Sequence, residues 1–82
     1  MKKEIFIEKV LEAGFDVKEC ARVPSFEILI SDDDGEHLAA LISKEYEREL
    51  VIFNAVNKCE PGDTAVIAGI LSEFAMTPIR DR

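Results

Sequence analysis

The spacing of the apolar residues changes twice along the chain, and this change constrains the fold more than any other feature. In residues 2–13 apolar side chains recur every three or four positions, which is the period of an amphipathic helix. In residues 26–31 they alternate along the chain, which is the period of a strand with one buried face. In residues 67–74 the helical spacing returns. This order predicts an α+β fold with a helix at each end and strands between them.

The first helix has a clear end signal. Gly14 follows the last apolar position, and glycine adopts the left-handed conformation that commonly ends a helix. Phe15 comes next and is expected to pack back on Val10, the hydrophobic contact that accompanies such ends. The helix should therefore end at Ala13.

The last helix is delimited by prolines. Pro61, Gly62 and Asp63 open it, and we expect Asp63 to cap free backbone N–H groups and to suit the positive end of the helix dipole. Pro78 disfavours the helical conformation at the residue before it, so the helix should end near Met76. Gly69 costs about 1 kcal/mol relative to alanine inside a helix, which indicates either close approach of another element or simple tolerance.

Two strands are expected between the first helix and the strongest turn signal. Residues 17–23 form a short β-branched stretch, and Pro24 separates them from residues 26–31. Residues 32–35 read Asp-Asp-Asp-Gly, in which aspartate side chains cap local N–H groups and glycine accepts a positive φ. A hairpin is expected to follow.

Residues 36–50 are compatible with two structures. A return strand would place Leu38, Ala40 and Ile42 on one face, and we favour this structure. The same stretch also satisfies helical spacing, and the alternative is an α-β-β-α-α order with residues 35–50 helical. Residues 50–53 suit a further strand at the edge of the sheet, and residues 54–59 are expected to form a loop.

The length of the chain allows one hydrophobic core. We expect the 82 residues to form a single domain, residues 1–82, with an N-terminal helix, a small antiparallel sheet of three to four strands and a C-terminal helix. Hydrophobic residues make up 48% and charged residues 33%, the composition of a folded protein. No apolar run approaches the roughly 20 residues of a membrane span, and no signal-peptide cleavage site follows the N-terminus. A cytoplasmic location is expected.

The sequence shows no motif for catalysis or metal binding. Cys20 and Cys59 lack CxxC spacing and His37 is the only histidine, so we expect two reduced structural cysteines and no zinc site. The Asp-Asp-Asp-Gly turn does not match a calcium loop, because Ile30 and Leu41 would fall at ligand positions, and a solvated turn is favoured over a loose cation contact. There is no nucleophile motif, phosphate loop or histidine pair. We therefore expect a protein that is not an enzyme and has no cofactor.

Excess negative charge lies in the middle of the chain. The net charge is -7, and residues 26–49 contribute -6 of it through eight acids and two bases. This balance argues against direct nucleic-acid binding and favours a basic protein surface as the partner. Carboxylates along one edge would imitate phosphates and compete for a basic cleft, whereas the alternative is that they only maintain solubility. The candidate binding residues are Asp32, Asp33, Asp34, Glu36, Glu45, Glu47 and Glu49.

Residues 74–82 read Phe-Ala-Met-Thr-Pro-Ile-Arg-Asp-Arg. This segment resembles the aromatic-Ala-x-Thr-Pro-Ile-x-x-Arg ending of small proteins encoded by phages and prophages of Gram-positive bacteria. The resemblance implies a phage protein in the cytoplasm of the host. By analogy with small acidic phage proteins, it also implies a stoichiometric inhibitor of the anti-CRISPR or anti-restriction type, a DNA mimic that binds a CRISPR effector or a restriction nuclease.

Two other functions remain open at this point, and so does the oligomeric state. The first is a structural or assembly role, in which Val51, Phe53 or Ile79 mediates self-association or docking. The second is a nucleotide-sequestering sponge, which requires basic contacts to an anionic ligand. The basic residues away from the termini that such a sponge would use are Lys18, Arg22, Lys44, Arg48 and Lys58.

Overall fold

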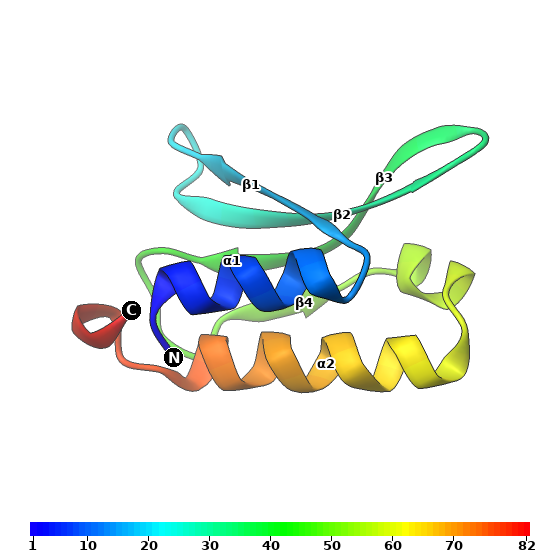
Figure 1. Ribbon diagram of the computed structural model, residues 1–82. Helices are drawn as coiled ribbons and strands as arrows, with labels where there is room; N and C mark the ends of the chain where they lie inside the picture. The colour runs from blue at the N-terminus through cyan, green and yellow to red at the C-terminus, as the bar shows by residue number, and fades with distance from the viewer.

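Four antiparallel strands form one sheet in the order β1-β2-β3-β4, and two helices cover one face of it (Figure 1). The computed structural model describes residues 1–82 except the side chains of Asn57 and Lys58. The elements are α1 (Lys3–Glu12), β1 (Asp16–Cys20), β2 (Ser25–Asp32), β3 (Gly35–Ser43), β4 (Leu50–Ile52) and α2 (Pro61–Met76), with 3₁₀ helices at Asn54–Lys58 and Ile79–Asp81. The predicted α+β fold is confirmed.

The end of α1 forms as the sequence predicts. Gly14 has a φ of +90°, and its N–H donates to the Leu11 carbonyl over 3.0 Å. The N–H of Phe15 donates to the Val10 carbonyl over 3.1 Å, which completes a Schellman motif. Phe15 is buried in the core beside Val10. The chain therefore leaves the helix at a fixed angle and enters β1 directly.

The ambiguous stretch is a strand over most of its length, so the helical alternative for residues 35–50 is wrong. β3 pairs with β2 from Gly35 to Ser43 and with β4 from Ala40 to Ile42. The turn before it has the predicted chemistry: the Asp34 N–H donates to Asp32 Oδ1 over 2.8 Å, and Gly35 has a φ of +116°. Pairing with two neighbours satisfies backbone groups that a helix would satisfy internally.

A bulge in β3 places Leu38 on the other face of the sheet from the one predicted. Ile28 pairs with Ala40 but the next residue, Leu29, pairs with Leu38, so Ala39 is an extra residue with no pairing residue in β2. Ala39 and Ala40 are both buried in the core. Leu38 lies opposite Leu29, on the face that the helices do not cover, and not with Ala40 as predicted.

Two further expectations about the second half of the chain are wrong. Residues 54–58 form a 3₁₀ helix where a loop was expected. Asp63 does not cap α2: the helix begins with Pro61 after an extended Glu60, whose side chain makes no capping hydrogen bond, and Asp63 lies in the first turn. The Thr64 hydroxyl instead donates to the Glu60 carbonyl over 3.2 Å. The helix ends at Met76, as Pro78 predicts.

Three phenylalanines tie both helices to the sheet. Phe6 of α1 and Phe74 of α2 stack with their ring centroids 4.0 Å apart, and Phe26 of β2 meets Phe74 edge-on at 5.3 Å. All three rings are buried. Offset-stacked and edge-on pairs add to the free energy gained by burying apolar area.

Neither helix in the described part of the chain is long and apolar enough to cross a membrane.

Gly69 is a site where a substitution should stabilise the fold. A Cβ added at this helical position meets no atom within 4 Å, so the glycine reflects tolerance and not close packing. We expect Gly69→Ala to raise the free energy of unfolding by about 0.5 to 1 kcal/mol, because it reduces the freedom of the unfolded chain. Urea denaturation followed by circular dichroism measures the change. Gly14→Ala is the matched control and should destabilise, since its φ is +90°; a loss of stability in Gly69→Ala would contradict the prediction.

Candidate protein-binding surface

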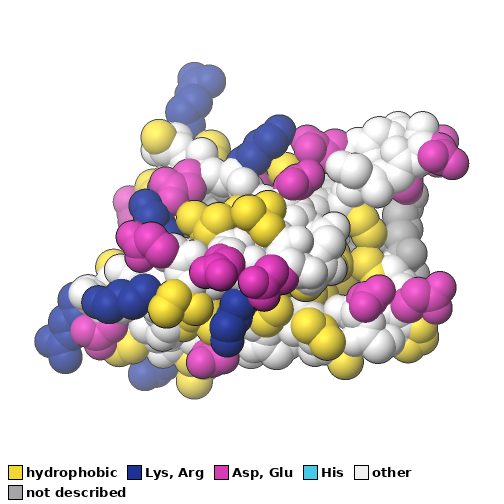
Figure 2. Space-filling view, viewed as in Figure 1, with side chains coloured by type: hydrophobic (Ala, Val, Ile, Leu, Met, Phe, Trp, Pro, Cys, Tyr) yellow, Lys and Arg dark blue, Asp and Glu magenta, His cyan; other side chains and the backbone are white. Residues whose placement is uncertain are grey.

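The seven candidate acidic residues lie in two separate loops. Asp32, Asp33, Asp34 and Glu36 lie at or beside the β2–β3 turn, and Glu45, Glu47 and Glu49 lie in the loop of residues 44–49, which joins β3 to β4. All seven are exposed. β3 has nine residues, so the two groups lie at its opposite ends, separated by roughly 30 Å of strand. They do not form one patch, and Figure 2 shows acidic side chains distributed over the visible face and at the hairpin tip, with basic side chains among them.

The group at the β2–β3 turn is partly neutralised. Lys18 Nζ donates to Glu36 Oε1 over 3.0 Å, and this hydrogen bond raises the pKa of Lys18. His37 Nε2 lies 3.0 Å from Asp32 Oδ1. Such exposed pairs add little stability, but they reduce the charge that a partner meets. Within the described side chains, Asp33 and Asp34 have no ion pair.

The loop of residues 44–49, by contrast, is held in place by several hydrogen bonds. Ser43 Oγ accepts the N–H groups of Glu45 and Tyr46 over 3.1 and 3.0 Å. The Arg48 N–H donates to the Ala75 carbonyl at the end of α2 over 2.8 Å. These bonds fix the loop against both the sheet and the last helix.

The three acidic side chains of this loop differ in their contacts. Glu47 Oε1 accepts the Ile79 N–H over 2.9 Å, so this carboxylate supports the fold. Glu45 and Glu49 make no ion pair with any described side chain and remain available to a partner. Tyr46 lies between them in sequence and is 64% exposed. Arg48 has a φ of +66°, a left-handed conformation that costs a non-glycine residue roughly 1 to 2 kcal/mol.

Arg82, the last residue of the segment 74–82, holds the base of this loop, and the sequence did not predict this role. Its guanidinium donates to three carbonyls: Nε to Thr77 over 3.1 Å, one terminal nitrogen to Ser43 over 2.7 Å and the other to Ala75 over 3.1 Å. It also lies 4.8 Å from the centre of the Phe74 ring. Burial lowers the pKa of Arg82, and Glu47 acts in the opposite direction. No local pattern signals this contact, because its partners come from two elements far apart in sequence.

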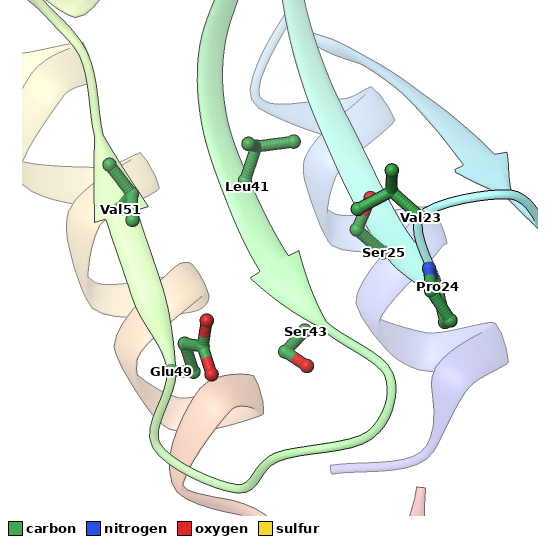
Figure 3. A pocket seen from close by; sticks show the side chains of 7 residues that line it. All are labelled: Val23, Pro24, Ser25, Leu41, Ser43, Glu49 and Val51. Carbon is green, nitrogen blue, oxygen red and sulfur yellow. The ribbon is translucent and has the colours of Figure 1, made fainter.

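A shallow hollow of about 110 Å³ lies beside the loop, on the sheet face opposite the helices (Figure 3). It is lined by Val23, Pro24, Ser25, Leu41, Ser43, Glu49 and Val51. Leu41 and Val51 are paired across β3 and β4, and Val23 belongs to the turn between β1 and β2. Of the seven candidate acids only Glu49 lines the hollow, and Val51, a candidate for self-association or docking, lines it too. The alternation of β3 predicts that Leu41 lies on the face opposite the core, because Ala40 and Ile42 on either side of it were expected on the other face.

The chemistry available elsewhere in the chain is limited. Cys20 and Cys59 are free thiols. Burial raises the pKa of Cys59, so a smaller fraction of this thiol is in the reactive thiolate form. The described residues contain no cluster of three or more His, Cys, Asp or Glu side chains suited to hold a metal ion.

Comparisons with protein-family models, curated proteins and solved structures find no match. The resemblance of residues 74–82 to phage proteins therefore stays a prediction.

Proposed function

We propose that this chain is a non-catalytic binding protein that presents acidic side chains to a basic surface of a nucleic-acid-handling protein. The observation that carries the proposal is the loop of residues 44–49, which is fixed by hydrogen bonds yet leaves the carboxylates of Glu45 and Glu49 without an ion pair among the described side chains. A rigid loop loses little conformational entropy on binding. Unpaired carboxylates are complementary to arginine and lysine side chains.

The charge distribution favours a basic partner over an acidic one. The net charge is -7. Lys3 and Lys44 both pair with Glu19, and Lys18 pairs with Glu36, so these cations are already engaged. Long-range attraction between opposite charges speeds association and selects the partner. A CRISPR effector or a restriction nuclease in a bacterial host is the class of partner that the resemblance implies, with the chain as its stoichiometric inhibitor.

The two-loop geometry changes the form of mimicry that we propose. Seven carboxylates along one edge would follow a phosphate backbone continuously, and the strand conformation of β3 separates them into two groups. We therefore propose the loop of residues 44–49 as the main contact and the β2–β3 turn as a distant, weaker one. Glu45 and Glu49 are the residues on which affinity should depend most.

Paired charge reversals test this proposal. Glu45→Lys with Glu49→Lys should slow association at least about tenfold at low salt, because steering by complementary charge is reversed at the contact. The double variant Asp33→Lys with Asp34→Lys makes the same change in net charge at the β2–β3 turn. It should slow association less than the first double variant does. The partner is captured from bacterial lysate on the immobilised chain and eluted with salt, and its association with each variant is measured by surface plasmon resonance. Equal rates for both variants and the parent chain would refute the proposal.

Self-association is a second candidate, supported by the edge of the sheet at β4. Val51 and Ile52 are 46% and 44% exposed, and the strand carries no charged residue. The opposite edge, β1, carries Asp16, Lys18 and Glu19, which discourage pairing with another strand. A dimer that resists dilution in light scattering would support this candidate, and a monomer at all concentrations would contradict it.

A further inference from the structure

We infer that the hollow beside Glu49 is the site at which the chain holds a single arginine side chain of its partner. This inference rests on the proposed function, since it names how the basic surface is engaged. It also assigns a role to residues outside the acidic loop. Leu41 and Val51 would contact the aliphatic stem, and Glu49 would bind the guanidinium group.

The floor of the hollow suits an aliphatic stem. Leu41 and Val51 lie side by side across β3 and β4, and Val23 faces them from the β1–β2 turn. Val51 is 46% exposed and Val23 is 67% exposed, so apolar area faces water in the free protein. Arginine and lysine bury their methylene groups along such surfaces while the charged group stays at the rim. The volume of about 110 Å³ suits one side chain and not a helix or a strand.

The rim of the hollow supplies the charge that selects the occupant. Glu49 precedes Val51 by two residues, which corresponds to roughly 6 to 7 Å along an extended chain and matches the reach of a long basic side chain. Its carboxylate has no ion pair with a described side chain. An apolar occupant would cover this carboxylate without compensating its charge, and that is unfavourable. A basic occupant instead pairs with it.

Arginine fits this rim better than lysine does. Its planar guanidinium forms two parallel hydrogen bonds with a carboxylate, and it is more weakly hydrated than an ammonium group. A further oxygen atom is provided by the hydroxyl group of Ser25, which also lines the hollow. A guanidinium has five N–H donors and can use several acceptors at once, whereas lysine has three donors on one atom.

A second copy of this chain is a poorer occupant than a basic partner. Each copy carries a net charge of -7, so two copies repel one another as they approach. Glu45, in the same loop as Glu49, also makes no ion pair with a described side chain, so the loop offers a basic segment a second carboxylate. Charge complementarity therefore points to a segment rich in arginine on a different protein.

Nuclear magnetic resonance with short peptides tests the inference directly. The probes are acetyl-Gly-Ser-Arg-Ser-Gly-amide and the same peptide with citrulline, which keeps the shape of arginine and lacks its charge, or with lysine. The arginine peptide should shift the methyl signals of Leu41 and Val51 in a saturable way at low salt. Glu49→Gln should weaken its binding about fivefold, the size expected for a partly exposed ion pair. Val51→Thr should weaken binding about twofold, because the hydroxyl makes the floor of the hollow less apolar, and should leave the fold unchanged, because Val51 is 46% exposed.

Matched variants and probes separate the possible outcomes. Glu8→Gln removes one charge from an exposed position on α1, on the other side of the sheet from the hollow, and should change the affinity less than twofold. Equal binding of the citrulline peptide, equal binding of the lysine peptide, or unchanged affinity in Glu49→Gln would overturn the inference. Shifts in the amides of residues 45–49 without shifts at the two methyl groups would also overturn it, while leaving the proposed function standing. No response to any basic peptide, together with partner association that charge reversal does not alter, would reject both.

Discussion

Replacing Phe74 with alanine should destabilise the native state by about 3 to 5 kcal/mol, the range for large aromatic truncations in a core. Phe74 is fully buried and contacts both Phe6 and Phe26, so its removal leaves a cavity where α1, α2 and the sheet meet. A chain of 82 residues has a total stability of roughly 4 to 12 kcal/mol, so the loss is a large part of it. Urea denaturation followed by circular dichroism measures the effect.

A milder variant keeps this prediction measurable if the alanine variant does not fold. Phe74→Leu retains much of the buried volume and should cost less than the alanine change. Phe53→Ala is the matched control, because Phe53 is 37% exposed and lies outside the core cluster. Its effect should be clearly smaller. Equal losses for Phe53 and Phe74 would show that the three-ring contact does not dominate the core.

Arg82→Ala should have the second largest effect, a loss of roughly 2 to 3 kcal/mol. Its guanidinium donates to the carbonyls of Thr77, Ser43 and Ala75, and hydrogen bonds from a charged donor are stronger than neutral ones. Arg82→Lys keeps the charge but cannot reach three acceptors at once, so it should recover only part of the loss. Thermal and urea unfolding give the stability of each variant.

The Arg82 prediction also has a local readout. The Arg48 N–H donates to the carbonyl of Ala75, to which Arg82 donates as well, so hydrogen exchange at the Arg48 amide should speed up in Arg82→Ala. Arg80→Ala removes the same charge two positions earlier, at an exposed side chain, and should change stability by less than about 0.5 kcal/mol. If Arg80 and Arg82 behave alike, the three-carbonyl contact is not what stabilises this end of the chain.

Local signals predicted the helices well, because their causes are local. The period of the apolar residues placed α1 and α2. Gly14 and Pro78 predicted their ends, since glycine accepts the positive φ that ends α1 and proline disfavours the helical conformation at the residue before it. Residues 36–50 were ambiguous because their spacing also fits a helix, although we favoured the strand. Pairing with β2 on one side and β4 on the other resolved the ambiguity, and a sequence pattern does not contain that pairing.

The candidate site was predicted less completely, for a related reason. The seven acids were identified as exposed, but whether they share an edge depended on the conformation of β3. The bulge at Ala39 was missed, because an extra residue becomes visible only when both strands are aligned. The hollow was missed as well: Val23, Leu41 and Val51 come from three segments and converge only in the folded sheet.

The placement of both helices on one side of the sheet separates the residues that stabilise the fold from those that we propose to contact a partner. Phe6, Phe26 and Phe74 belong to the core between the helices and the sheet, whereas Leu41 and Val51 line the hollow on the other face (Figure 3). Side chains on the uncovered side can therefore be exchanged without repacking the interior. A library randomised at Val23, Leu41 and Val51 should yield many folded members with altered partner preference, so that the chain serves as a small scaffold for selecting new binders.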